Sequence, residues 1–237
     1  ESRNAFRLAR EAGFDNINLD LMYGLPEQDT AAALADLSSL IALGPEHISW
    51  YQLTLEPNTL FHHRPPPVPD DDCLADIMDA GQGLLAAAGY QRYEISAYAR
   101  PGRQCAHNLN YWQFGDYLGI GAGAHGKLSL PGGTVRRISK PRQPEAYLKT
   151  AAAGAVAGER EVAPVELPVE FFLNVLRLPA GVPATLFEAR TGLPVSTIAE
   201  PLKKAREIGL MSDDPHLLQP SERGLLYLND LLALFEP

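Results

Sequence analysis

The sequence predicts an α/β fold that is followed by a smaller, winged-helix-like α+β unit. Through the first hundred residues, segments with helical spacing of apolar side chains alternate with strand-like segments, which is typical of βαβ units with parallel strands. In the last third, three short helical patterns precede a pair of apolar segments and a final helix. That order is typical of a helix-turn-helix followed by a β-wing.

Each element of the first half has its own signal. The chain opens inside a helical pattern that Gly13 closes, and it does not begin with Met. We interpret this as a truncated gene model or an expressed fragment, with a processed N-terminus as the alternative. Residues 14–22 alternate apolar and polar side chains, as a half-buried strand does. The later elements are a helix at 30–44, a strand at 47–55, a proline-rich spacer at 64–69, a helix at 73–88 and a strand at 90–99.

The second half begins with a glycine-rich stretch at residues 118–126, where backbone can approach another surface closely. The alanine-rich residues 151–157 predict a linker. We therefore expect two domains, at residues 1–150 and 160–237. The expected elements of the second domain are helices at 170–178, 184–191, 195–208 and 221–235, with a short hairpin within 210–219.

Composition limits the class of protein. The chain has 237 residues, 46% of them hydrophobic and 21% charged, which is a globular balance. Its net charge of −9 disfavours binding to nucleic acid. No apolar run approaches the roughly 18 residues of a transmembrane helix, and no signal peptide is evident. Cys73 and Cys105 make no disulfide framework, so we expect a cytoplasmic protein, and two cysteines cannot supply the usual ligands of an iron–sulfur cluster.

Three residues stand out as candidates for binding. Asp20, near the end of a predicted parallel strand, could accept hydrogen bonds from a ribose or an amino group, or it could initiate the following turn. His107 in HNLNYW could ligate haem iron beside aromatic side chains, or it could be a hydrogen-bonded structural residue. His125 in GIGAGAHG could approach a ligand, or the segment could be a core strand of small residues.

Other polar residues carry weaker signals. His62 and His63 are neighbours on a chain that we expect to be extended, so their side chains point apart and a shared metal site is disfavoured. Glu56, Glu94 and Asp116 are possible acid–base groups, but nothing distinguishes them from solvated surface carboxylates, which is our interpretation of each. No catalytic residue is assigned from spacing.

Long collinear segments carry a family resemblance. NINLDLMYGLPEQ, HISWYQLTLEPNTLF, AGYQRYEISAYA and HNLNYWQFGDYLGIGAGAHGK resemble the HemW-type haem chaperones, a branch of the oxygen-independent coproporphyrinogen III oxidase-like family in the radical S-adenosylmethionine (SAM) superfamily. The resemblance implies the C-terminal portion of a partial (β/α)6 barrel, with about its last two strands, and then the family's small terminal domain.

The resemblance also implies roles by position. Asp20 matches an aspartate that contacts SAM, and Thr54 and His125 fall near the same ligand. HNLNYW matches the HNxxYW motif, which implies His107 as the haem ligand and Tyr111 and Trp112 as residues that shape the haem site. The family's CxxxCxxC and GGTP loops are absent here, so the 4Fe-4S cluster and SAM chemistry are expected only in the complete protein, and whether the chain is an enzyme stays open.

We therefore expect a haem chaperone that binds haem and transfers it to respiratory haem proteins. The alternative within the family is an oxygen-independent coproporphyrinogen III oxidase of porphyrin biosynthesis. A third alternative is a binding module without a cofactor, in which the winged-helix-like unit contacts a partner. The expected partners are haem and haem-accepting respiratory proteins, a homodimer is a candidate, and nucleic acid and a transmembrane segment are not expected.

Overall fold

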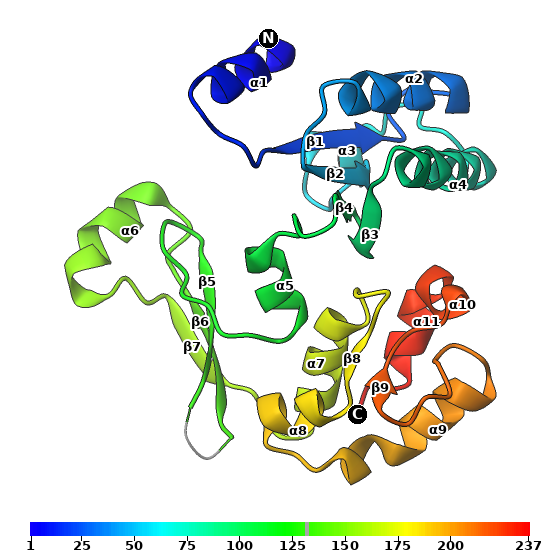
Figure 1. The fold of residues 1–237 in the computed structure, drawn as a ribbon. Coiled ribbons are helices and arrows are strands. Elements are labelled where there is room, and N and C mark those ends of the chain that lie inside the picture. The colour runs from blue at the N-terminus through cyan, green and yellow to red at the C-terminus, as the bar shows by residue number, and fades with distance from the viewer. Residues whose placement is uncertain (131–132) are drawn as a thin grey trace. The chain divides into compact units, whose positions relative to one another are not determined.

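The computed structural model describes residues 1–130 and 133–237 (Figure 1). The chain divides into two compact units, residues 1–105 and 106–237, each with its own hydrophobic core. The domain limits expected from the sequence, 1–150 and 160–237, stay a prediction, because a compact unit in space and a domain in evolution need not share a boundary.

The first unit is built on a four-stranded sheet with the order β1-β2-β4-β3. β1 (Asn18–Tyr23) and β2 (His47–Gln52) are parallel and are joined by α2 (Thr30–Ile41), which confirms the expected βαβ unit. Asp29 caps α2, since its side chain accepts a hydrogen bond from the amide of Ala32.

One strand prediction was wrong in this sheet. Residues 90–99 form a hairpin of β3 (Gln91–Glu94) and β4 (Ala97–Ala99), and β4 pairs antiparallel with both β3 and β2. The buried Glu94 carboxylate accepts hydrogen bonds from the amide and the hydroxyl of Ser96. These bonds hold the turn, so the chain reverses where an uninterrupted strand was expected.

The two faces of β1 differ in exposure. Along β1 the odd-numbered side chains are half-buried or buried, whereas Asn18, Asp20 and Met22 are exposed. The remaining helices of the unit are α1 (Ser2–Glu11), α3 (Leu60–His63) and α4 (Asp71–Ala87). The expectation that His62 and His63 lie on extended chain was wrong, because both belong to α3.

The second unit contains an antiparallel sheet that was not predicted. Its strands, in spatial order, are β5 (His125–Ser129), β6 (Val135–Ser139) and β7 (Gly158–Glu161). The alanine-rich residues 151–157 lie inside this unit, because they connect α6 (Pro144–Thr150) and the 3-10 turn η1 (Ala151–Ala153) to β7. In this structure they are a connection within one compact unit, and their role as a boundary between domains stays a prediction.

The C-terminal part follows the predicted helix order with shifted boundaries. β8 (Val182–Pro183) pairs with β9 (Leu217–Leu218), a segment far away in sequence. The arms of the hairpin expected within residues 210–219 meet only through an isolated antiparallel bridge between Met211 and Pro220, with a hydrogen bond from the amide of Ser212 to the carbonyl of Gln219. The expected last helix is divided at Tyr227, whose φ of −109° and ψ of 46° are not helical. The elements are α7 (Leu167–Val175), β8 (Val182–Pro183), α8 (Thr185–Thr191), η2 (Val195–Ile198), α9 (Ala199–Glu207), β9 (Leu217–Leu218), α10 (Glu222–Leu226) and α11 (Leu228–Ala233).

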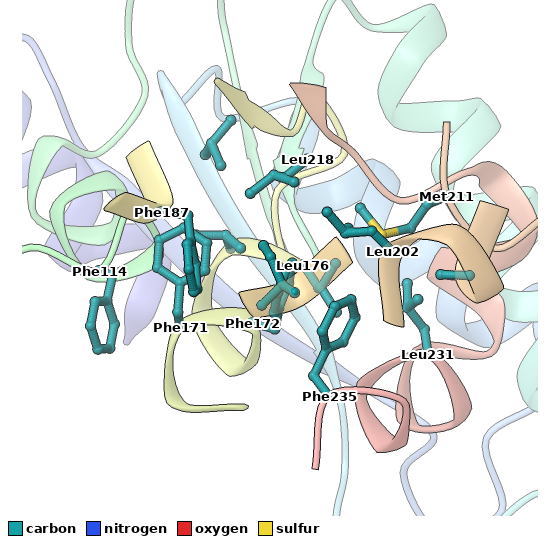
Figure 2. Close-up of a cluster of buried hydrophobic side chains, with 14 of the residues drawn as sticks. Phe114, Phe171, Phe172, Leu176, Phe187, Leu202, Met211, Leu218, Leu231 and Phe235 are labelled. Atoms are coloured by element: carbon teal, nitrogen blue, oxygen red, sulfur yellow. The ribbon is translucent and has the colours of Figure 1, made fainter. Parts of the chain in front are cut away.

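Phenylalanines form the centre of the second core (Figure 2). Phe171 meets Phe187 edge-on at 5.2 Å between ring centroids, and Phe172 stacks on Phe235 at 3.6 Å. Phe114, which follows α5 (Ala106–Trp112), meets Phe171 edge-on at 5.7 Å. The segment after α5 is thus fixed to α7, and this contact helps to position α5.

The predicted fold class is confirmed. The chain is a mixed α/β protein in which a parallel β1–β2 pair precedes a small C-terminal α+β part, and its sheets are small and not closed into a barrel. Among the described residues, no helix is both long enough and apolar enough to cross a bilayer.

Candidate functional site

The HNLNYW segment forms the short helix α5, which the sequence did not predict. His107 and Tyr111 are four residues apart, so they lie on the same face of the helix. Their ring centroids are 4.7 Å apart and their planes are inclined by 77°. The predicted ligand and one predicted neighbour are therefore in direct contact.

The imidazole of His107 is exposed, and nothing in the described chain bonds to it. Neither ring nitrogen takes part in a hydrogen bond or ion pair with any residue in 1–130 or 133–237. Its contact with Tyr111 is an edge-to-face ring contact. A neutral imidazole with a free nitrogen is a suitable axial ligand for haem iron.

Tyr111 and Trp112 have different surroundings. Tyr111 continues the aromatic row toward Tyr117, with ring centroids 4.2 Å apart. Trp112 instead packs against the core of the second unit, and the guanidinium of Arg177 lies 4.4 Å from the centroid of its ring. The buried indole nitrogen of Trp112 has no hydrogen-bond partner among the described residues. Trp112 therefore anchors α5, whereas Tyr111 lies beside His107.

The exit from α5 is sterically constrained. Phe114 adopts a φ of 54°, an uncommon conformation for a residue with a Cβ atom. At Gly115 a Cβ atom would lie 2.1 Å from Oδ1 of Asn110, so no side chain fits there. Asn110 also donates a hydrogen bond of 2.9 Å to the carbonyl of Asp116. These contacts fix the path of the chain from α5 toward β5.

A buried lysine, which the sequence did not single out, holds this exit in place. The ammonium of Lys127, 1% exposed, donates to the carbonyl of Phe114 at 3.0 Å, to Oδ1 of Asp116 at 3.0 Å and to Ser129 Oγ at 3.1 Å. It also lies 4.0 Å from the centroid of the Phe114 ring. Burial lowers the pKa of Lys127, and the hydrogen bond and charge of Asp116 offset only part of that effect.

Two of the three carboxylates interpreted as solvated are held by the protein. Burial alone would raise the pKa of Asp116, but hydrogen bonds from the amide and hydroxyl of Ser129 and from Lys127 lower it below the ordinary value. Glu94 is buried in the β3–β4 turn. Asp116 stays exposed despite these bonds, and Glu56 is exposed as expected and accepts a hydrogen bond from Thr54 Oγ1 at 2.9 Å.

Asp20 and Thr54 both lie on exposed parts of the first unit. Asp20 is the third residue of the six-residue strand β1, paired in register with Ser49, so its expected place near the strand end was wrong. Its carboxylate accepts a hydrogen bond of 2.7 Å from the amide of Asn18. Thr54 follows the carboxyl end of the neighbouring parallel strand β2.

His47 organises the polar face beside Asp20. Its Nδ1 lies 2.6 Å from Oδ1 of Asn18, which only accepts, so Nδ1 carries the proton. Nε2 then accepts from the Tyr93 hydroxyl at 2.7 Å. Burial lowers the pKa of His47, and the charges of Glu94 and Asp20 raise it only in part. In-register pairing of β1 and β2 would have placed Asn18 beside His47, because each is the first residue of its strand.

His125 is the exposed first residue of β5 in the second unit. The glycine-rich residues before His125 do not form the core strand that was one of the two alternatives, because β5 begins only at His125. The close approach of backbone expected in this stretch is present at Gly119, where a Cβ atom would lie 2.4 Å from the carbonyl oxygen of His125. Asp20 and Thr54 belong to the first unit, so a ligand shared by all three residues stays a prediction.

The described residues do not form a metal cluster site. Cys73 and Cys105 are free, and no group of three or more His, Cys, Asp or Glu side chains in the described ranges is arranged to hold a metal ion. The donor set of a 4Fe-4S cluster, which is usually four thiolates, does not fit these residues.

Comparisons with known proteins agree with this structure. A family model described as the HemN C-terminal domain matches residues 162–227. Proteins named heme chaperone HemW from Escherichia coli and Haemophilus influenzae are each 49% identical over 235 residues, which cover 99% of this chain and 61% of each relative. The solved structure of coproporphyrinogen III oxidase (HemN) from Escherichia coli, titled a radical SAM enzyme, has a TM-score of 0.76 and 20% identity over 99% of this chain and 58% of that one.

The chain has the fold of the solved HemN structure, and its residues 162–227 match the HemN C-terminal domain. In sequence it is similar to the HemW proteins, as the resemblance of its motifs indicated, and the matched terminal domain agrees with a C-terminal part of such a protein. It spans about three fifths of the length of these curated relatives, 61% in each case.

Proposed function

We propose that this chain is the haem-binding C-terminal part of a haem chaperone, which binds haem through His107 and transfers it to respiratory haem proteins. The observation that carries the proposal is the exposed imidazole on α5, which has an aromatic neighbour and no bonding partner in the described chain. The names of the relatives that share the segment, heme chaperone HemW, support the same function.

The ring geometry is compatible with haem. An iron–nitrogen bond lies in the plane of the imidazole and is perpendicular to the macrocycle, so the imidazole plane stands perpendicular to the porphyrin. Because Tyr111 is inclined by 77° to His107, its ring is able to lie nearly parallel to a porphyrin that His107 ligates. Aromatic contact with the macrocycle would then be the role of Tyr111, and Trp112 would hold the helix that carries both residues.

Exposure of the site suits a carrier. If His107 on a surface helix binds the iron from one side of the haem, the other side of the haem stays accessible. A recipient protein could bind the iron from that side with its own ligand. A deeply buried haem would first require local unfolding of the carrier. We accordingly expect measurable but reversible haem binding in a cytoplasmic protein, with a homodimer as a candidate assembly.

The complete protein is proposed to bind SAM as well. Asp20 and Thr54 would contact SAM from the open face and the carboxyl ends of the parallel strands, and His125 would lie near it. SAM with its 4Fe-4S cluster supplies radical chemistry when bound, but the ligands of the cluster are not among the residues of this chain. In the chain itself the carboxylate of Asp20 is held by the amide of Asn18 and remains exposed, as a ligand for hydroxyl groups should be.

Coproporphyrinogen III oxidation is the second candidate function, favoured by the fold shared with HemN. The complete protein, assayed anaerobically with coproporphyrinogen III, would reveal it through loss of two carboxyl groups from the substrate. We rank this function second because the sequence relatives are named as chaperones and because HNLNYW matches the chaperone motif.

The test is a titration of the 237-residue chain with ferric haem, followed by the Soret band. We expect His107→Ala to weaken binding about tenfold or more, equivalent to about 1.4 kcal/mol, and to shift the Soret maximum because an axial ligand is lost. His216→Ala is the matched control, since His216 is an exposed histidine of the same unit. An unchanged Soret spectrum and affinity in the His107 variant would reject this ligand.

A further inference from the structure

The aromatic row that begins at His107 ends on an arginine. The rings of Tyr111 and Tyr117 follow His107 at centroid distances of 4.7 Å and 4.2 Å. The hydroxyl of Tyr117 accepts a hydrogen bond of 2.9 Å from Nη1 of Arg137, on β6. A ligand that covers the tyrosines would therefore meet an imidazole at one end and a guanidinium at the other.

Arg137 belongs to a basic face of the three-stranded sheet. In the antiparallel register Lys127 pairs with Arg137, and Arg137 pairs with Arg160, so all three side chains point to the same face. A hollow of about 290 Å³ opens beside the sheet, and its lining includes His125, Arg137 and Arg160. The hollow is large enough to admit a carboxylate group.

The acids that balance this face come from outside the sheet. Glu170 of α7 forms an ion pair with Arg137 and another with Arg160, and Glu166 binds Arg160 as well. A guanidinium has five N–H donors in a planar fork, and Tyr117 and Glu170 engage only the two terminal nitrogens of Arg137. Arg137 therefore retains donors for an incoming anion, although Glu170 competes for its charge.

We propose that Arg137 anchors a propionate group of the tetrapyrrole, while Tyr111 and Tyr117 contact the macrocycle between this anchor and His107. Haem carries two carboxylates on one edge and iron at its centre, so its polar groups match the two ends of the row. A planar guanidinium binds a carboxylate through two parallel hydrogen bonds, which makes arginine suited to this task. The assignment of iron to His107 rests on the proposed function, whereas the anchor requires only a propionate-bearing porphyrin.

The neighbouring arginines do not fit this role. Arg136 points to the opposite face of β6 and pairs there with Glu159. Arg160 lies on the correct face but is held by both Glu166 and Glu170, and it has no contact with the tyrosines in the described structure. Arg137 alone among these three joins the aromatic row.

The experiment compares three ligands of the 237-residue chain by fluorescence or absorbance titration: ferric haem, metal-free protoporphyrin IX and protoporphyrin IX dimethyl ester. We expect Arg137→Gln to weaken both propionate-bearing ligands about tenfold, because a charge-assisted hydrogen bond is lost. The same variant should bind the dimethyl ester as the unaltered chain does. Arg136→Gln is the matched control, on the same strand, and should change none of the three affinities.

A second variant separates anchoring from folding. Glu170→Gln breaks the same ion pair with Arg137 but releases the guanidinium, so it should bind haem and protoporphyrin IX as tightly as the unaltered chain or more tightly. If Arg137 served only to hold the fold, both variants would weaken all ligands alike. Loss of binding in Glu170→Gln, or equal losses of acid and ester in Arg137→Gln, would overturn the proposal.

The two proposals fail in different ways. Metal-free protoporphyrin IX reports on Arg137 without iron, so its affinity should fall in Arg137→Gln and stay unchanged in His107→Ala. If haem binding does not depend on His107 while protoporphyrin IX still depends on Arg137, the iron ligand is wrong and the anchor stands. If haem binding depends on His107 but protoporphyrin IX binding does not depend on Arg137, His107 remains the iron ligand and the proposed role of Arg137 is wrong.

Discussion

Two histidines of this chain, one in each unit, show opposite environments. His47 is 5% exposed and bonded through both ring nitrogens, to Asn18 and to Tyr93. His107 is exposed on α5, and its nitrogens meet no partner in the described structure. The first imidazole is a part of the fold, and the second is available to a ligand.

The comparison teaches that burial and bonding, rather than residue type or motif, decide which histidine is free to coordinate iron. A buried imidazole bonded on both sides would have to break two hydrogen bonds to become a ligand, each with a cost. An exposed imidazole has only water to displace. Three predictions about stability follow from this contrast.

The largest effect should be on stability. His47→Ala removes one buried hydrogen bond to Asn18 and one to Tyr93 and opens a cavity, so it should lower the free energy of unfolding of the first unit by about 2–4 kcal/mol. His107→Ala should change stability by less than about 0.5 kcal/mol. Urea denaturation followed by tryptophan fluorescence in a Trp112→Phe background, where Trp50 is the remaining tryptophan, measures the first value. Similar losses in both variants would break the contrast.

The same contrast between a buried, bonded side chain and an exposed one can be tested in the second unit with Lys127 and Lys203. Lys127→Met removes the charge that three acceptors surround, and it leaves the carbonyl of Phe114 without its donor. We expect a loss of about 2 kcal/mol in the free energy of unfolding. Lys203→Met, at an exposed position with one long ion-pair contact of 3.9 Å, is the control and should be nearly neutral. Trp112 fluorescence in a Trp50→Phe background reports this unit, and equal losses would contradict the role of Lys127.

The smallest effect concerns pH. Because burial lowers the pKa of His47 below its ordinary value of 6.5, the unfolded chain takes up a proton first as pH falls. The first unit should therefore lose stability as pH drops from 6.5 toward the folded pKa, by at most about 1.4 kcal/mol per pH unit. His47→Gln should remove this slope, as followed by Trp50 fluorescence in urea at stepwise pH. A slope that persists in the variant would assign it to another group.

The βαβ unit and the C-terminal helices were predictable because their apolar spacing and closing glycines are local signals. The β3–β4 hairpin was missed because residues 90–99 alternate continuously, and only the bonds from Ser96 to Glu94 reveal the turn. The β5–β6–β7 sheet was missed because its strands are short and rich in arginine and glutamate. Their pairing is decided by long-range contacts that local spacing does not encode.

The sequence pointed to the candidate site residues that lie within the HNLNYW motif, but not to those outside it. HNLNYW drew attention to His107, Tyr111 and Trp112, but it gave no sign that Tyr111 lies beside the histidine while Trp112 packs against the core. Arg137 is 30 residues from His107 and carries no motif. Its place in the row follows from the register of β5 and β6, which no pattern in the sequence specifies.

That register has a consequence for how the site could be lost or altered. Side chains alternate along β6, so a shift of one residue relative to β5 would turn Arg137 to the other side and bring Arg136 or Ile138 into its position. A single insertion or deletion between the paired segments could thus exchange a cation for an aliphatic side chain without any substitution. If Arg137 anchors a propionate as proposed, such a change of register would alter the preference for acidic tetrapyrroles.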